Sequence, residues 1–252
     1  MNIAVLTGAS SGLGIEFFKA INEKYQSLDE IWLIARRKER MEEISKDSKI
    51  KVRIFPLDLI KEESIGIIKD ALIKEKANIK LLVNNAGFGI LGNIYDSDEN
   101  KQMDMVSLNC RALTGLTTIA LPYMASGSKI INVCSIAAFA PNPRLTVYSA
   151  TKSYVMFYSR SLRYELKEKG IGVTALCPGP MRTEFLTVAK IPGNSKTFDD
   201  FLPYVDPKKA VKGVMKAADK NKAVYTPKIY YKLYRFIAKI LPKEWVMPIS
   251  KA

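Results

Sequence analysis

Short apolar segments alternate with amphipathic ones along most of the chain, and this alternation constrains the fold more than any other feature. The apolar segments predict strands near residues 2–7, 30–35, 51–56, 80–84, 128–135 and 171–177. The segments between them have helical periodicity, over residues 13–25, 37–46, 61–76, 98–122 and 147–169. Strands separated by helices pair in parallel through right-handed crossovers. We therefore predict a doubly wound α/β fold, with helices on both faces of a mostly parallel sheet.

The chain has 252 residues, of which 48% are apolar, and no internal repeat or interdomain linker interrupts them. Residues 1–252 are therefore expected to form one domain. Periodicity fails over residues 180–205, where prolines recur. We predict that residues 185–205 form a lid over an apolar substrate, because irregular apolar segments of this length are usually functional; packing on the sheet is the alternative.

Histidine is absent, which excludes a Ser-His-Asp triad, a Cys-His pair and an imidazole metal site. No metal site is predicted. Three cysteines, Cys110, Cys134 and Cys177, lie in apolar surroundings, which favours buried free thiols in a reducing cytosol. We therefore expect a cytoplasmic protein. Acid–base chemistry at neutral pH must then use tyrosine, lysine, cysteine or carboxylate side chains.

The first predicted strand runs directly into the glycine-rich segment Thr7–Gly14 and then into a helix. Glycines let the backbone turn tightly and approach a pyrophosphate, and the helix N-terminus offers free N–H groups and partial positive charge. A turn without ligand is the alternative, but the position after the first strand favours dinucleotide binding.

The second predicted strand ends at Ala35, which is followed by Arg36 and Arg37. A site selective for NAD places a carboxylate here to bind the ribose 2′-hydroxyl. This chain instead offers two guanidinium groups, which pair well with phosphate. The sequence therefore predicts a preference for NADP(H).

Taken in chain order, these and later motifs resemble the short-chain dehydrogenase/reductase family, in its simple one-domain, NADP-preferring form, from residue 2 to about residue 185. The motifs that carry the resemblance are Thr7–Gly14, Asp58-Leu59, Asn84-Asn85-Ala86-Gly87, Asn109, Ser135, Tyr148 with Lys152, and Pro178-Gly179-Pro180-Met181 with Thr183. The resemblance implies a Rossmann-type fold and hydride transfer between NADP(H) and a carbonyl or secondary alcohol.

The resemblance also implies residue roles. Asp58 would accept a hydrogen bond from adenine, and Thr183 would bind the nicotinamide carboxamide. The positions expected to contact NADP(H) are Gly8, Ser10, Ser11, Gly12, Leu13, Gly14, Arg36, Arg37, Asp58, Leu59, Asn85, Ala86, Gly87, Tyr148, Lys152, Pro178, Gly179, Met181 and Thr183.

The expected catalytic residues are Asn109, Ser135, Tyr148 and Lys152. Tyr148 and Lys152 are four apart in a helical segment and so share a face. A nearby ammonium and the nicotinamide charge should lower the pKa of Tyr148, which would exchange a proton with the substrate oxygen. Ser135, at a strand end, would hold that oxygen, and by resemblance Asn109 would hold a water that links Lys152 to solvent.

Net charge is +14, and residues 206–252 contain 12 Lys or Arg against 3 Asp or Glu. The segment 228–241, within a basic extension over 228–252, has helical spacing of apolar residues with lysines on another face. Docking on the protein or on a partner subunit is the commoner use of such a helix and is our expectation. Peripheral contact with a membrane is the alternative. No nucleic-acid module is recognised.

The substrate is expected to be an apolar small molecule such as a steroid, fatty or aromatic ketone or alcohol. A homo-dimer or homo-tetramer is expected, because the family commonly pairs the helices that correspond to 98–122 and 147–169. Apolar residues beyond one core stripe support this: Met103, Val106, Leu113, Leu116, Thr117, Val155, Tyr158, Leu162 and Leu166. The rival functions are a non-catalytic NADP(H)-binding protein and a peripheral membrane reductase of a lipid-like substrate.

Overall fold

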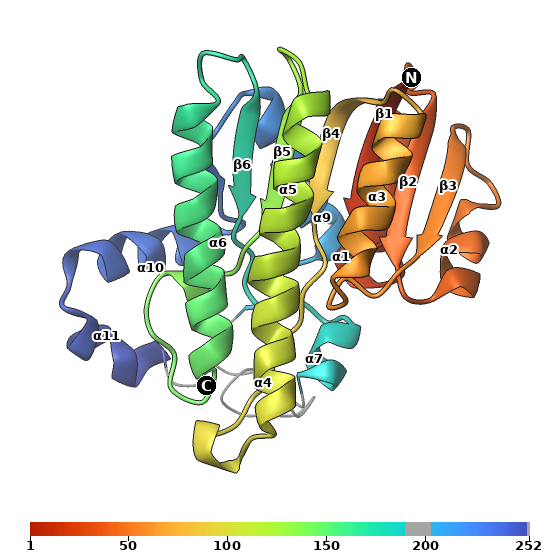
Figure 1. The fold of residues 1–252 in the computed structure, drawn as a ribbon. Coiled ribbons are helices and arrows are strands. Elements are labelled where there is room, and N and C mark those ends of the chain that lie inside the picture. The colour runs from red at the N-terminus through yellow and green to blue at the C-terminus, as the bar shows by residue number, and fades with distance from the viewer. Residues whose placement is uncertain (190–202, 251–252) are drawn as a thin grey trace.

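Seven parallel strands form one sheet in the computed structural model, which describes residues 1–189 and 203–250. The strand order is β3-β2-β1-β4-β5-β6-β7, so the chain winds outward from β1 in two directions. This is the predicted Rossmann-type fold (Figure 1). The strands are β1 (Asn2–Thr7), β2 (Glu30–Ala35), β3 (Lys51–Pro56), β4 (Asn78–Asn84), β5 (Lys129–Val133), β6 (Gly172–Leu176) and β7 (Val224–Tyr225).

Helices cover both faces of the sheet. In Figure 1, α3, α5 and α6 lie in front of it, and α1 and α9 lie behind. The longer helices are α1 (Gly12–Lys24), α2 (Lys38–Ser45), α3 (Glu63–Lys74), α4 (Glu99–Val106), α5 (Leu113–Ala120), α6 (Thr146–Glu165), α9 (Pro207–Asp219), α10 (Ile229–Ile240) and α11 (Lys243–Ser250). Shorter helical segments are η1 (Ile94–Asp96), η2 (Ser107–Ala112), η3 (Leu121–Tyr123), η4 (Ile136–Ala138) and α7 (Glu184–Val188).

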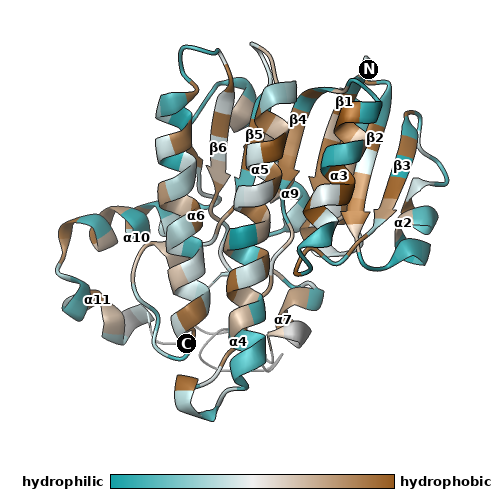
Figure 2. Cartoon of the chain, viewed as in Figure 1, coloured by the Kyte–Doolittle hydropathy of each residue, from teal (hydrophilic) through white to brown (hydrophobic). Residues whose placement is uncertain are grey.

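Strand β1 shows how the sequence separates the two halves of the core. Ile3 and Val5 pack on one face with Ile68 of α3, whereas Ala4 and Leu6 pack on the other with α1 and α9. Successive side chains of a strand point to opposite faces, so an unbroken apolar strand must be covered on both sides. Figure 2 shows these strands as largely hydrophobic beneath helices with hydrophilic outer faces.

The predicted strands and helices agree with the structure to within a few residues, and four features were missed. Strand β7 and helices α9 and α11 were not predicted, and α7 lies in the segment 180–205 where no periodicity was seen. The predicted helix 98–122 is divided by the π-helical turn η2, which separates α4 from α5. None of the described helices is both long and apolar enough to cross a bilayer.

Helix α10 is the predicted amphipathic helix, but the expectation that its apolar face docks on the protein is wrong for most of that face. Tyr231 and Ala238 are the buried residues of α10. Most residues that set the apolar periodicity are exposed: Ile229, Leu233, Phe236, Ile237 and Ile240, while Leu241 is half-buried against the core. The helix therefore packs through the side opposite to the predicted one.

Candidate active site

The glycine turn between β1 and α1 has the backbone geometry that a pyrophosphate requires. Gly8 and Gly12 have φ values of +65° and +49°, which other residues rarely adopt. A Cβ on Gly14 would overlap the carbonyl oxygen of Gly8. Ser11 begins α1 without a side-chain capping bond, so the first turn keeps N–H groups for an anion. Ser10, Ser11, Leu13 and the glycines lie on this turn, and they fit the diphosphate of a dinucleotide.

Asparagines and a threonine fix the neighbouring strand against this turn. Asn85 donates hydrogen bonds from Nδ2 to the carbonyl oxygens of Thr7 (2.9 Å) and Gly8 (3.1 Å). The backbone N–H groups of Asn85 and Ala86 donate to Thr7 Oγ1. Asn84 bonds to Asn132 on β5 at 2.8 Å. These bonds hold the carboxyl ends of three strands together beside the glycine turn.

Arg36 lines an open groove of about 440 Å³ at the end of β2 and β3, together with Leu57, Asp58 and Lys61. Asp58 accepts a hydrogen bond from the backbone of Ile60 at 3.1 Å. This is where an adenosine is expected. Leu59 is buried in the core, and Leu57 lines the groove. Contact of Leu59 with the cofactor stays a prediction.

Arg37 connects the glycine turn to α7. Its side chain donates to Ser10 Oγ (3.3 Å) and forms an ion pair with Glu184 (2.8 Å). Arg40 pairs with the same carboxylate at 2.9 Å. Arg37 therefore has a carboxylate partner before any phosphate arrives, and Arg40 is a further cation that the sequence motif did not indicate.

Ser135, Tyr148 and Lys152 meet at the carboxyl end of β5. Ser135 follows this strand, and its side chain is hydrogen-bonded to Tyr148 of α6. Lys152, one turn further along α6, places Nζ 5.7 Å from the Tyr148 ring centroid and donates to Val133 O at 2.9 Å. All three side chains are buried. The arrangement can hold an oxygen atom and deliver a proton to it.

Asn109 lies in the π-helical turn η2, a type of irregularity that is frequent at functional sites. Its Nδ2 donates to Phe88 O (2.9 Å) and Thr151 Oγ1 (3.0 Å). A Cβ on Gly87 would come within 2.8 Å of Asn109 Oδ1 and 3.3 Å of Lys152 Nζ. The absence of a side chain at Gly87 therefore lets both side chains approach its backbone closely, and the four expected catalytic residues lie around one centre.

The lowering of the Tyr148 pKa expected from a neighbouring ammonium is not found. Burial raises the pKa of Tyr148, and the hydrogen bond from Ser135 opposes this rise only in part. Burial also lowers the pKa of Lys152, because it disfavours the ammonium. Desolvation is therefore the largest influence on the pKa of both groups. The effect of a nicotinamide charge on Tyr148 stays a prediction.

Cys134, beside Ser135, is buried, and its thiol donates to the carbonyl oxygen of Lys152 at 3.1 Å. Cys177 is also buried, whereas Cys110 is only half-buried, and all three are free thiols. Burial raises the pKa of Cys110 to about 11. A thiolate is the nucleophilic form of cysteine, so the raised pKa of Cys110 disfavours nucleophilic chemistry there. Cys134 and Cys177 are enclosed in a buried apolar cluster and serve packing. No group of three potential metal-ligating side chains occurs within residues 1–189 and 203–250.

The segment after β6 closes the cofactor side of the site. The Pro178 carbonyl accepts from Ile136 N (3.0 Å), and Met181 packs on the core. A Cβ on Gly12 would lie 3.3 Å from the Thr183 side chain, so Thr183 stands directly beside the glycine turn. Gly179 packs against the ring of Tyr231, where a Cβ would overlap that ring.

Apolar side chains surround Tyr148 on the substrate side. Its ring centroid is 5.6 Å from that of Phe185, and a Cβ on Gly89 would lie 2.8 Å from the Tyr148 ring. The surrounding cluster includes Phe88, Ile90, Leu91, Ala137 and Leu186. Part of the predicted lid, including Ile191, Phe198, Phe201 and Leu202, lies outside the described residues.

Comparison with known proteins agrees with this geometry. The profile of the short chain dehydrogenase family matches residues 2–191, which is most of the chain. The chain belongs to the short-chain dehydrogenase family. As a short-chain dehydrogenase it is an oxidoreductase that acts on CH–OH or carbonyl groups with a nicotinamide cofactor.

Named relatives of this short-chain dehydrogenase act on different compounds. Sulfoacetaldehyde reductase 2 of Chromohalobacter salexigens is 32% identical, over 74% of this chain and 75% of its own. The very-long-chain 3-oxoacyl-CoA reductase of Anas platyrhynchos is 32% identical, over 74% of this chain and 62% of its own.

Solved structures agree with the fold. A short-chain dehydrogenase from Sphingobium yanoikuyae in complex with NADPH has a TM-score of 0.79 and 24% identity, with 96% of both chains covered. A serine dehydrogenase complexed with NADP⁺ has a TM-score of 0.76 and 26% identity, over 88% of this chain and 94% of its own.

Proposed function

We propose that this short-chain dehydrogenase is NADP(H)-dependent and interconverts an apolar ketone or aldehyde with its alcohol. The observation that carries the proposal is the buried group of Ser135, Tyr148 and Lys152 at the carboxyl end of β5, where ligands bind in open α/β sheets. The glycine turn and the arginines at the end of β2 supply a diphosphate site and a 2′-phosphate site nearby.

Bound nicotinamide would supply the hydride for reduction or accept it in oxidation. In reduction, Ser135 would donate a hydrogen bond to the carbonyl oxygen and hold it beside Tyr148. Tyr148 would give its phenolic proton to that oxygen as negative charge develops on it. In oxidation, the Tyr148 phenolate would take the alcohol proton. Lys152 would bind the ribose hydroxyls, and Asn109 would hold a water that links Lys152 to solvent and returns the proton.

The apolar cluster around Tyr148 supports an apolar substrate. Phe185, Leu186 and Phe88 place hydrocarbon where the substrate would extend from its reacting carbon. Among the relatives, the very-long-chain 3-oxoacyl-CoA reductases act on fatty compounds, and a hydroxysteroid dehydrogenase-like protein is also similar to the chain. Sulfoacetaldehyde is small and anionic, and this cluster favours it less.

Turnover of NADPH against a panel of steroid, fatty and aromatic ketones tests the proposal. Tyr148→Phe should lower turnover by about 10²- to 10⁴-fold while NADPH still binds. Tyr164→Phe is the matched control, because Tyr164 is an exposed tyrosine on the same helix, and it should leave the rate unchanged. Near-normal turnover by Tyr148→Phe would refute the mechanism. NADPH binding without turnover of any ketone would favour the non-catalytic alternative.

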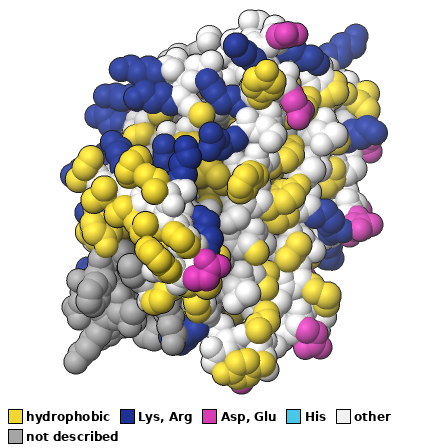
Figure 3. All heavy atoms as spheres, turned by 90° about the vertical axis from the view of Figure 1, so that its left-hand side faces the viewer, with side chains coloured by type: hydrophobic (Ala, Val, Ile, Leu, Met, Phe, Trp, Pro, Cys, Tyr) yellow, Lys and Arg dark blue, Asp and Glu magenta, His cyan; other side chains and the backbone are white. Residues whose placement is uncertain are grey.

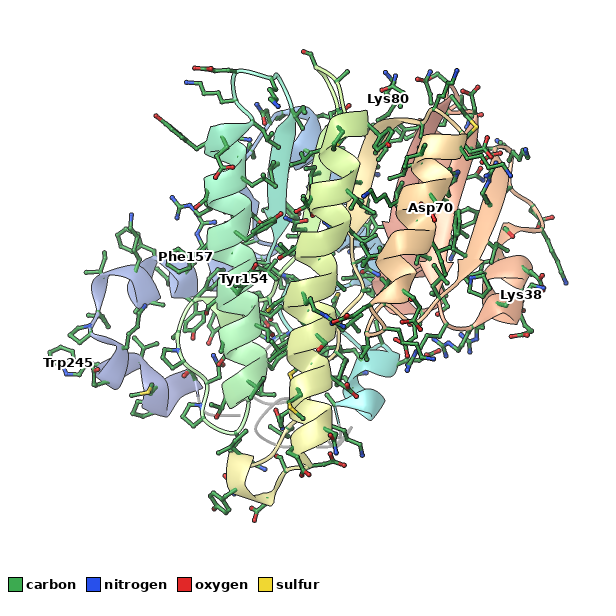
Figure 4. The ribbon with its side chains drawn as sticks, in the orientation of Figure 1. Lys38, Asp70, Lys80, Tyr154, Phe157 and Trp245 are labelled. Atoms are coloured by element: carbon green, nitrogen blue, oxygen red, sulfur yellow. The ribbon has the colours of Figure 1, made fainter. Side chains whose placement is uncertain are left out.

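We also propose a homo-oligomer in which α4, α5 and α6 meet a second copy. Most residues expected to support this contact pack in the core instead: Leu113, Leu116, Thr117, Val155, Leu162 and Leu166. Met103 and Val106 are exposed as expected, and Tyr154 and Phe157 of α6 join them. Figure 4 shows Tyr154 and Phe157 on the outer side of α6. Apolar surface of this kind is what obligate interfaces bury.

A further inference from the structure

Helix α10 carries an apolar stripe that faces away from the protein. Ile229, Leu233, Phe236 and Ile240 follow one another at intervals of four, three and four residues. A helix turns about 100° per residue, so these four side chains, the outer stripe, project from one side. They are 79%, 56%, 62% and 61% exposed, respectively. A continuous apolar patch of this kind on a protein surface usually marks a site that binds a partner or a membrane.

The exposure of the outer stripe is not caused by a detached helix. On the opposite side of α10, Tyr231 is fully buried and donates from its hydroxyl to Pro203 O at 2.8 Å. Tyr234 packs its ring 6.0 Å from that of Phe139. Lys243, at the start of α11, donates to Phe139 O at 3.1 Å. The helix is therefore held on the body by its inner side, and its outer side is presented as a fixed surface.

Positive charge runs along one edge of the outer stripe. Lys228, Lys232, Arg235 and Lys239 lie on an adjoining side of the helix and are exposed. Within residues 1–189 and 203–250, no salt bridge involves any of these four. Glu244 is the one acidic residue in the sequence between Lys220 and Ser250. Figure 3 shows hydrophobic side chains gathered on this face of the molecule with Lys and Arg beside them.

Helix α11 adds an aromatic side chain to the same region. Trp245 is 67% exposed and points away from the body in Figure 4. Its neighbour Val246 is buried, so α11 is itself packed on the protein. Tryptophan prefers the level of lipid headgroups, where its ring is partly apolar and its N–H stays hydrated.

We infer that the outer stripe of α10, together with Trp245, docks this protein onto the surface of an anionic phospholipid membrane. The apolar side chains would enter the boundary between headgroups and acyl chains, and the lysines would face lipid phosphates. The length of α10 fits a surface position, because a helix of 12 residues spans only about 18 Å.

A second copy of the chain fits this surface less well. In an antiparallel two-fold contact the stripes would face each other, and the two rows of basic side chains would lie along the same edge. Glu244 is the one acidic residue in the sequence between Lys220 and Ser250, so like charges would oppose that contact at physiological salt. Negative lipid headgroups remove this repulsion, and a membrane is therefore the favoured occupant.

The docking surface lies next to the candidate active site. The inner side of α10 touches Gly179 through Tyr231, and Phe139 follows closely after Ser135 in the chain. An apolar substrate dissolved in the membrane would then be close to the site. The docking itself goes beyond the proposed reaction and does not depend on it.

Vesicle co-sedimentation of the full chain tests the inference. The unmodified protein should pellet with phosphatidylcholine vesicles that contain phosphatidylserine, and much less with phosphatidylcholine alone or at high salt. Leu233→Glu/Phe236→Glu should weaken the binding at least about tenfold, because fully burying one such side chain is already worth that much. Ile67→Glu/Ile73→Glu, with the same charge change on exposed residues of α3, should bind like the unmodified protein.

Tryptophan emission gives a second measurement that needs no change in the stripe. The chain has two tryptophans, and Trp32 is fully buried, so vesicles should act on Trp245. Anionic vesicles should shift the emission to shorter wavelength, and Trp245→Phe should abolish the shift.

Failure of the unmodified chain to pellet with anionic vesicles would overturn the inference. A lipid-free dimer that Leu233→Glu/Phe236→Glu converts to a monomer would overturn it in favour of a second copy. Ketone turnover, measured without vesicles, tests the reaction separately.

Discussion

Replacing Arg36 by alanine is expected to reduce the preference for NADPH over NADH more than replacing Arg37. The two cofactors differ only in the 2′-phosphate, so the ratio of their Kd values isolates the contacts to that group. Arg36 is exposed, lines the groove with Asp58, and forms no salt bridge within the described part of the chain. Arg37 already bonds to Ser10 and Glu184.

The magnitude follows from these contacts. A hydrogen bond to a charged group is worth about 1.5–3 kcal/mol, and the open groove favours the lower end. Arg36→Ala should therefore weaken NADPH binding about tenfold and leave NADH binding unchanged. Arg37 must leave Glu184 to reach a phosphate, and an exposed ion pair of this kind is worth about 0–1 kcal/mol. The net loss for Arg37→Ala should be smaller by that amount.

Titration of each variant with NADPH and NADH, followed by calorimetry, measures both Kd values. Glu184→Gln is the matched variant, because it releases Arg37 and Arg40 and should tighten NADPH binding, by at most about fivefold for 1 kcal/mol. Arg36→Asp should reverse the preference. An unchanged ratio in Arg36→Ala, or equal use of both cofactors by the unmodified protein, would refute the reasoning.

Three further outcomes are expected. Gly14→Ala should lower the free energy of unfolding by about 1–3 kcal/mol, because the added Cβ would overlap the backbone of the glycine turn. Gly66→Ala is the control, because the added Cβ on α3 meets open space, and it should not lower that free energy. Denaturant titration measures both variants. Burial raises the pKa of Tyr25 to about 12 and that of Tyr148 further, so the unfolded chain loses these protons first. The free energy of unfolding should therefore fall as the pH rises above about 10 and level off above the pKa values of the folded protein. An unfolding free energy that is constant over this range would contradict the raised pKa values of the two tyrosines. Light scattering should give a multiple of 28.2 kDa that Phe157→Glu reduces, and a mass near 28.2 kDa for the unmodified chain would contradict the oligomer.

Local patterns in the sequence predicted the elements that position the site. Strands such as β1 and β2 are apolar on both faces and therefore visible as unbroken runs. The glycine turn was predictable because Gly8 and Gly12 adopt backbone angles that exclude most other residues. The short strand β7 was missed because two residues, Val224 and Tyr225, carry no periodic signal.

The predicted catalytic residues also came together as expected, although the sequence separates Asn109 from Lys152 by more than forty positions. Parallel winding accounts for this, since the carboxyl ends of all strands meet at one edge of the sheet. Roles that depend on the surroundings of a side chain were less predictable. The pKa of Tyr148 rises because burial disfavours the phenolate, and burial is set by packing from several elements.

The sequence by itself determined the order of the functional segments along the chain. The glycine turn comes first, then the two arginines after β2, and then a serine, a tyrosine and a lysine that meet at one edge of the sheet. Only the tertiary structure decided which apolar residues are covered. Leu59 is buried in the core, whereas the stripe of α10 faces outward although its periodicity suggested the core. Periodicity shows that a helix has an apolar side, but the side that is buried depends on what lies beside it, which here is Tyr231 against Gly179.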